Sequence, residues 1–168
     1  DEFDIVLDSE LDDITTNFAP QLASNSPGWK LLLNHPTWQG EKVLSSSSTL
    51  QNGIFFTTYF PDASSLGKTC SPALGKNRAY GISAFDGSPL PRRDGSTNPG
   101  GGTGPGTDPP LGAADRYAEL DQPGIAPEVT MLFPEKDKLT CLSGVEVLSI
   151  CRPFKSRIKT YWRETNAN

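Results

Sequence analysis

The sequence predicts an all-β protein made of small antiparallel sheets. Outside the acidic N-terminus, no long window repeats apolar residues at the spacing of three and four that indicates a helix. Short runs of aromatic and β-branched residues recur instead, and the turn-forming pairs Asn52-Gly53 and Asp86-Gly87 adjoin them. With 16 Gly, 15 Pro and only 35% hydrophobic residues, the composition favours turns and long loops around a modest core.

The clearest predicted element is a β-hairpin. Ile54–Phe60 is a run of aromatic and β-branched residues that ends at Pro61, which is typical of a central strand covered on both faces. Lys42–Leu50 precedes it as a Ser-rich extended segment. Asn52-Gly53 joins the two runs and predicts a type I′ turn between them.

Two more strands are expected in the same antiparallel sheet. Arg78–Phe85 alternates large and small residues and runs directly into the turn pair Asp86-Gly87. Gly28–Leu33 follows a loop rich in Asn, Ser and Pro and is expected to supply the fourth strand.

A second sheet is expected beyond a change in composition. Gly95–Gly112 contains seven Gly and four Pro, too little apolar surface to offset the entropy of ordering it, so a flexible loop is predicted. Strand patterns resume at Val129–Phe133, Leu139–Leu142, Val145–Ile150 and Arg157–Arg163.

The expected organisation therefore has four parts. These are an acidic and polar N-terminal loop segment at 1–27, a first sheet at 28–90, a Gly/Pro-rich loop at 91–115 and a second sheet at 116–168. Two small sheets separated by a long loop suit either a small β-sandwich or consecutive blades of a β-propeller. No clean internal repeat decides between them.

Charge and hydropathy exclude two classes of function. The net charge of −5 opposes the sequence-independent phosphate contacts of nucleic-acid binding, and seven acidic residues crowd the first 13 positions. No apolar stretch approaches the ~18 residues of a membrane span. The chain begins at Asp1 and its only Met is Met131, so we expect a processed or excised segment whose targeting signal lies upstream.

Cysteine spacing predicts one structural disulfide. Cys141 and Cys151 bracket a short strand-like segment and can close a small loop, whereas Cys70 has no local partner. Pairing of Cys70 with either of the others remains open from spacing alone. A disulfide would favour secretion, although three thiols alone do not establish it.

No catalytic or metal-binding constellation is predicted. His35 is the only histidine, it lies in a turn-like segment, and no Gly-x-Ser-x-Gly motif accompanies it. The cysteines lack the paired spacing of a zinc site, the Gly100–Gly106 stretch lacks a following Lys-Ser/Thr, and the N-terminal aspartates lack the spacing of a calcium loop. We therefore predict that the chain is not an enzyme and that this segment holds no cofactor.

Two aromatic-containing regions are candidates for ligand contacts, but the sequence assigns no ligand-binding residue. Trp29 and Trp38 flank a loop where exposed rings can contact sugars, although Trp more often belongs to a core. Near the C-terminus, basic residues surround Tyr161 and Trp162, and the wet face of a charged strand is favoured there over an anion site. These basic residues are Arg152, Lys155, Arg157, Lys159 and Arg163.

Three ordered stretches carry a resemblance to a known family. They are GWKLLL followed by GEKVLSSSSTLQNGIFFTTYFP (Gly40–Pro61), CSPALGKNRAYGISAFDGSP (Cys70–Pro89), and RYAELDQPGIAPEVTMLF (Arg116–Phe133) with a terminal KTYWRE (Lys159–Glu164). Together they cover most of residues 28–164 and resemble the C-terminal propeller domain of the type IV pilus tip-associated adhesins, the PilY/PilC-like proteins.

The resemblance implies a secreted bacterial protein at the pilus tip, cell surface or outer membrane that supports pilus biogenesis, adhesion and twitching motility. Its expected partners are pilins or minor pilins, the remainder of the propeller and a host or surface receptor. The chain would supply roughly the last two blades. No segment matches the family's calcium loop, so any calcium ligands of the full protein are expected upstream.

Two alternatives remain open. One is a fragment of a quinoprotein-type propeller dehydrogenase, suggested by Tyr80, Ala84 and Gly87, although the ligands and carboxylate of such an enzyme are not found. The other is a generic surface glycan-binding β domain, which predicts saturable sugar binding by the isolated chain.

Overall fold

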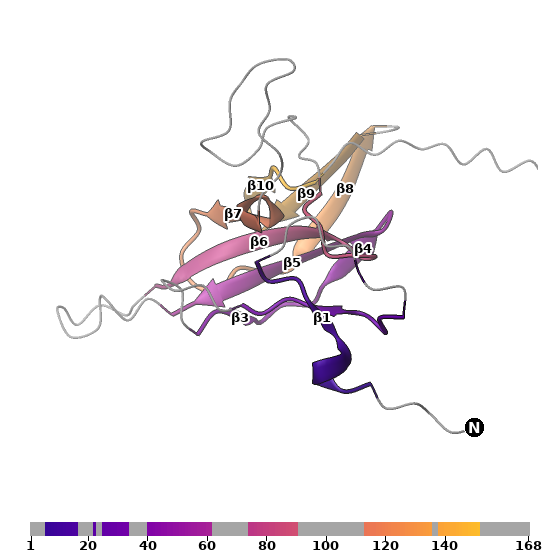
Figure 1. Cartoon of the computed structure of the whole chain (residues 1–168). Helices are drawn as coiled ribbons and strands as arrows, with labels where there is room; N and C mark the ends of the chain where they lie inside the picture. Colours follow the sequence, from indigo (N-terminus) through magenta and orange to yellow (C-terminus); the bar gives the residue numbers. More distant parts are fainter. Residues whose placement is uncertain are drawn as a thin grey trace, which may run out of the picture.

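The computed structural model describes residues 6–16, 22, 25–33, 40–61, 74–90, 113–135 and 138–151, without the side chains of residues 113, 114, 135 and 138. In these ranges the chain forms strands and two short 3₁₀ turns, and no α-helix is present among them (Figure 1). The all-β prediction is confirmed. The elements are η1 (Asp8–Glu10), β1 (Asp12–Asp13), β2 (Trp29–Lys30), β3 (Lys42–Val43), β4 (Ser48–Leu50), β5 (Gly53–Phe60), β6 (Lys76–Ser83), η3 (Ala113–Arg116), β7 (Tyr117–Leu120), β8 (Val129–Glu135), β9 (Lys138–Ser143) and β10 (Glu146–Leu148).

The first sheet is an antiparallel meander centred on β5 and β6. Its order is β3-β5-β6-β7, and β4 pairs with the other half of β5, so β3 and β4 act as one interrupted strand along the same edge. β5 pairs with β6 over its whole length, from Gly53 opposite Ser83 to Phe60 opposite Lys76. The predicted central strand and its hairpin partner are therefore both present.

The hairpin turn lies one residue earlier than the Asn-Gly pair suggested. Leu50 pairs with Gly53, so the two loop residues are Gln51 and Asn52, with φ of 46° and 64°. This is the left-handed conformation that a type I′ turn requires at both positions. Gly53 is instead a buried strand residue, where an added Cβ would lie 2.7 Å from a methyl group of Leu90. Close packing, rather than the turn, is the reason for this glycine.

The prediction that Gly28–Leu33 forms the fourth strand of the first sheet is wrong. Only Trp29–Lys30 is a strand, and it pairs in parallel with Asp12–Asp13, inside the segment expected to be a loop. We call the paired strands β1 and β2 the N-terminal arm. The indole nitrogen of Trp29 donates to the carbonyl of Ala84 at 3.3 Å, which fixes the N-terminal arm against the end of β6. The pairing was mispredicted because a two-residue strand pair is stabilised by long-range side-chain contacts of this kind. The local hydrophobic pattern does not reveal such contacts.

The second sheet is also a meander, in the order β10-β9-β8. Its three strands match the predictions for 129–133, 139–142 and 145–150, the last as the shorter β10. The predicted strand Arg157–Arg163 and most of the Gly/Pro-rich loop lie outside the described residues. β7 pairs with β6, so the part of the chain after residue 116 contributes to both sheets.

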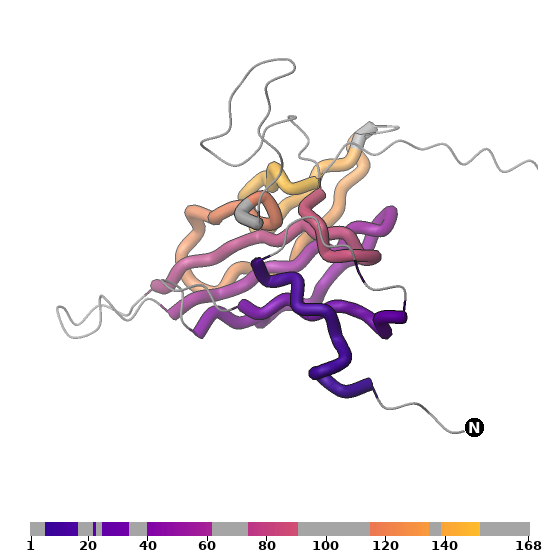
Figure 2. The backbone as a smooth tube through the Cα atoms, in the orientation of Figure 1, coloured from indigo at the N-terminus to yellow at the C-terminus, as the bar shows by residue number. Residues whose placement is uncertain are grey.

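The core lies between the two sheets. Phe55 and Ala79 from the first sheet form one buried cluster with Val129 and Leu139 from the second, together with Cys141. Both sheets are open. In Figure 2 the indigo N-terminal arm runs below the magenta strands, whereas the orange and yellow strands of the second sheet lie above them.

Candidate functional site

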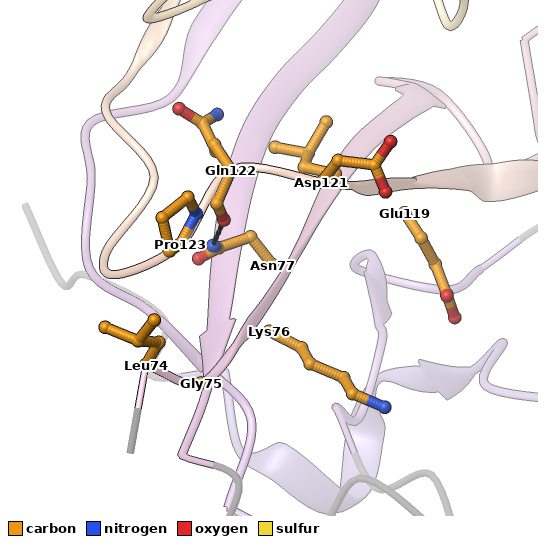
Figure 3. Close-up of a pocket in the computed structure, with 9 residues that line it drawn as sticks. Leu74, Gly75, Lys76, Asn77, Glu119, Asp121, Gln122 and Pro123 are labelled. Atoms are coloured by element: carbon orange, nitrogen blue, oxygen red, sulfur yellow. Dashed lines mark hydrogen bonds between the residues drawn. The ribbon is translucent and has the colours of Figure 1, made fainter. Parts of the chain in front are cut away.

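A hollow of approximately 330 Å³ lies at one end of the first sheet, where β6 begins and β7 ends. Figure 3 shows Leu74 and Lys76 on one side and the segment Asp121–Pro123 on the other, with Asn77 between them. The hollow thus joins the start of β6 to the loop that leads toward the second sheet.

Asn77 holds the loop wall of this hollow in place. Its side chain is fully buried, and its Nδ2 donates to the carbonyls of Gln122 at 2.8 Å and Gly124 at 2.7 Å. Its Oδ1 accepts from the amide of Ala126 at 3.1 Å. The amide of Gly124 donates to the carbonyl of Leu74 at 2.8 Å, which ties the two walls together. A single buried amide that satisfies three backbone groups makes this loop rigid.

Charged groups lie on the rim. Lys76 and Asp121 are exposed on opposite sides of the hollow, and Glu119, a residue of β7, is exposed as well. The Glu119 carboxylate forms a 3.5 Å ion pair with Arg78, and the amide of Asp121 donates to Glu146 at 3.2 Å. The lining therefore includes a flexible ammonium donor and a carboxylate acceptor beside the loop that Asn77 holds, which suits binding of a small polar group.

A buried ionic cluster lies nearby, on the face of the first sheet opposite the core. Because side chains alternate along a strand, Arg78 and Tyr80 point away from the side that Ala79 occupies. The Glu41 carboxylate accepts from the hydroxyls of Thr58 and Tyr80 and pairs with Arg78 at 3.3 Å. The side chains of Glu41 and Arg78 are 1% and 3% exposed, so both charges are desolvated and depend on each other.

Aromatic rings surround this cluster. The ring of Phe56 stacks on Tyr80 with centroids 4.9 Å apart, and the guanidinium of Arg78 lies 4.1 Å from the ring centre of Tyr117. Burial raises the pKa of Tyr80 well above its usual range, and the adjacent Glu41 carboxylate adds to the effect. With three donors directed at Glu41, the cluster serves as an internal fastening between β5, β6 and the start of β3.

A second buried cation attaches the N-terminal arm. Arg116 is 1% exposed; its Nε donates to the carbonyl of Gly87 at 2.7 Å and its Nη1 to the carbonyl of Ile14 at 2.8 Å. Burial lowers the pKa of Arg116. The backbone near β1 is thus joined to the turn after β6 through one side chain of η3.

The sequence-predicted disulfide is present. Cys141 in β9 is bonded to Cys151, and both side chains are fully buried in the core. Trp29 contacts the end of β6 rather than an open surface, since its indole donates to Ala84. His35, Trp38, Cys70 and the basic C-terminal cluster lie outside the described residues.

Sequence reasoning missed Asn77, Glu41 and Arg78. Each is a polar residue in or beside a predicted strand, and only its burial makes it notable. One signal was available in the sequence. Arg78 shares a strand face with Tyr80, and a charged residue is rarely buried unless it is paired. Its partner Glu41 is 37 residues away and could not be identified from spacing.

No family model, curated protein or solved structure matches this chain. Among the described residues, no helix is long and apolar enough to span a membrane, and no group of three or more His, Cys, Asp or Glu side chains is placed to hold a metal ion.

Proposed function

We propose that this chain is a binding and scaffold segment of a type IV pilus tip-associated protein and acts outside the cell. The observation that carries the proposal is where the three family-like stretches lie. Gly40–Pro61 forms β3, β4 and β5, Cys70–Pro89 contains β6, and Arg116–Phe133 contains β7 and most of β8. The first two stretches and the start of the third thus supply consecutive strands of the first sheet, from β3 to β7, as in a propeller blade, and the third continues into β8 of the second sheet.

The outer face of the second sheet supports a position within a larger assembly. Leu142 pairs with Thr130 and Val147, and Leu132 pairs with Thr140. This row of side chains contains no charge, although Leu132 and Val147 are 44% and 62% exposed. A solvated antiparallel sheet normally carries polar side chains on its outer face, so the exposed apolar side chains of Leu132 and Val147 favour a sheet that a neighbouring blade covers.

The buried disulfide supports an extracytoplasmic location. Disulfides form and persist in secreted and periplasmic proteins and are rare in the reducing cytosol. Cys141 and Cys151 close a separation of 10 residues inside the core. The bond is compatible with secretion through an oxidising compartment, and the finer location at the pilus tip rests on the resemblance.

The test is made in the source bacterium with the chromosomal gene. An in-frame deletion of residues 113–151 removes β7 and the second sheet, and we expect far fewer surface pili and a loss of twitching motility. An immunoblot of the secreted fraction establishes that the shortened protein is still exported. Val145→Ser, at a residue that is 95% exposed, is the matched control and should leave piliation unchanged. Normal piliation with the shortened protein exported would contradict the proposal.

A further inference from the structure

We propose that the hollow between the start of β6, the end of β7 and the loop at 121–123 binds one neutral sugar unit of an extracellular glycan. The inference goes beyond the pilus proposal and does not depend on it. It rests on three properties of the hollow, which are its fixed shape, its mixture of donors and acceptors, and its size.

The shape is fixed before any ligand arrives. Asn77 secures the carbonyls of Gln122 and Gly124, and Gly124 in turn binds Leu74. Gly75 has a φ of 67°, and a Cβ there would overlap the ring of Tyr59. Glycine at this position therefore allows the ring to pack directly against the wall of the hollow. A preorganised wall lowers the entropic cost of holding a small ligand.

The chemical lining matches a pyranose ring. Leu74, Leu120 and Pro123 offer apolar surface for the C–H groups of the ring. The Asp121 carboxylate accepts from sugar hydroxyls, and the Lys76 ammonium donates to hydroxyl or ring oxygens. Hydroxyl groups both donate and accept, so a neutral sugar is able to pair with either charged group.

The charges around the hollow select against ionic ligands. Glu119 and Asp121 line it, and Glu146 contacts the backbone of Asp121, so an acidic sugar meets more carboxylates than ammonium groups. A simple cation is repelled by the Lys76 ammonium at the rim, and the Glu119 carboxylate is already paired with Arg78. A neutral polyhydroxylated ligand avoids both conflicts.

The volume sets the expected affinity. At approximately 330 Å³ the hollow is at the lower end of the range for ligand sites, which is enough for a single monosaccharide. At the binding efficiency usual for polar ligands, one hexose is expected to bind with a dissociation constant of about 1 mM or weaker. A glycan presented in many copies would gain strength by avidity.

The test is an amide NMR titration of the full chain with methyl α-mannoside, methyl β-galactoside and methyl N-acetyl-β-glucosaminide. We expect at least one of them to cause saturable shifts at residues 74–77 and 119–124. N-acetylneuraminic acid and choline are the ionic comparison probes and should bind at least several-fold more weakly. Absence of saturable shifts with all three neutral sugars, shifts that map elsewhere, or tighter binding of an ionic probe would each overturn the proposal.

Two substitutions on the rim localise the binding. Asp121→Asn and Lys76→Ala change exposed side chains and should each weaken sugar binding about tenfold, as expected for the loss of a charge-assisted hydrogen bond. Glu128→Gln is the matched control, since this exposed carboxylate lies outside the hollow. Unchanged affinity in both rim variants, with native amide spectra, would also overturn the proposal. Piliation is not part of this readout, so failure here is distinguishable from failure of the pilus proposal.

Discussion

The two sheets are fastened by different chemistry on different faces. The first sheet carries the Glu41–Arg78 pair and its aromatic neighbours on the face turned away from the core, whereas the second sheet is joined by the Cys141–Cys151 bond within the core. The ionic cluster depends on every member being present, because each partner offsets the desolvation of the other. The covalent bond depends on redox conditions instead. The two regions should therefore fail under different perturbations.

The largest expected effect comes from breaking the ion pair on one side. Glu41→Leu leaves the buried Arg78 guanidinium without its main counter-charge, and we expect the free energy of unfolding to fall by about 3–5 kcal/mol. Urea unfolding followed by fluorescence measures this loss.

The control for this variant changes the other carboxylate on the same guanidinium. Glu119 is 64% exposed, so Glu119→Gln should cost less than about 1 kcal/mol. If Glu41→Leu costs no more than Glu119→Gln, the outer face of the first sheet is not an ionic fastening and the contrast between the sheets is lost.

The next effect tests the second sheet. Replacing Cys141 and Cys151 together by Ala removes a constraint on the unfolded chain, and the short loop predicts a loss of about 3 kcal/mol. Dithiothreitol should lower the wild-type stability in urea by a similar amount and leave the double variant unaffected. A stability that neither change alters would show that the sheet is held by packing alone.

The third effect concerns the attachment of the N-terminal arm. Gly87 has a φ of 63°, and a Cβ at this position would overlap the side chain of Ile14. Gly87→Ala should therefore cost about 2–3 kcal/mol and speed amide hydrogen exchange in β1. Gly124, with a φ of 80° and no atom within 4 Å of an added Cβ, is the matched control and should cost about 1 kcal/mol. Equal losses would mean that strain alone, without the contact to Ile14, explains the result.

The smallest effect is a dependence on alkaline pH that belongs to the first sheet. Tyr80 has a raised pKa in the folded protein and an ordinary pKa of about 10 in the unfolded chain. The folded state therefore retains the proton more strongly, and this contribution to stability is complete below pH 10 and is lost as the pH rises above it. From Tyr80 alone the loss approaches about 1.4 kcal/mol per pH unit in that range.

The variant Tyr80→Phe isolates this contribution, because the other tyrosines titrate in both proteins. The difference in stability between wild type and variant should shrink between pH 9 and pH 11 when both are unfolded in urea. A constant difference across that range would show that the ionisation of Tyr80 does not change the stability of the folded protein.

Local patterns predicted the local features of this fold. The run of apolar residues in β5, the strands of the second sheet and the Cys141–Cys151 spacing were all visible in short stretches of sequence. The hairpin was found with its turn displaced by one residue, because the sequence does not distinguish a glycine needed for packing from one needed for φ.

The remaining features arise from contacts between distant residues. Arg78 and Glu41 are 37 residues apart, and Arg116 reaches Ile14 across 102 residues. Whether a polar side chain is buried depends on which strands become neighbours, so the ionic cluster and the hollow beside Asn77 became evident only in three dimensions. The pairing of β2 with β1 depends in the same way on the side-chain contacts of Trp29 and Arg116.

The position of the disulfide also decides how mechanical load enters the molecule. β10 is an edge strand of only three residues, whereas β9 lies in the middle of the second sheet. Tension applied to the chain beyond Cys151 passes through the sulfur–sulfur bond directly to Cys141 in β9. The edge strand is thereby protected from being peeled away, and the chain between Cys141 and Cys151 is withheld from extension while the bond is intact.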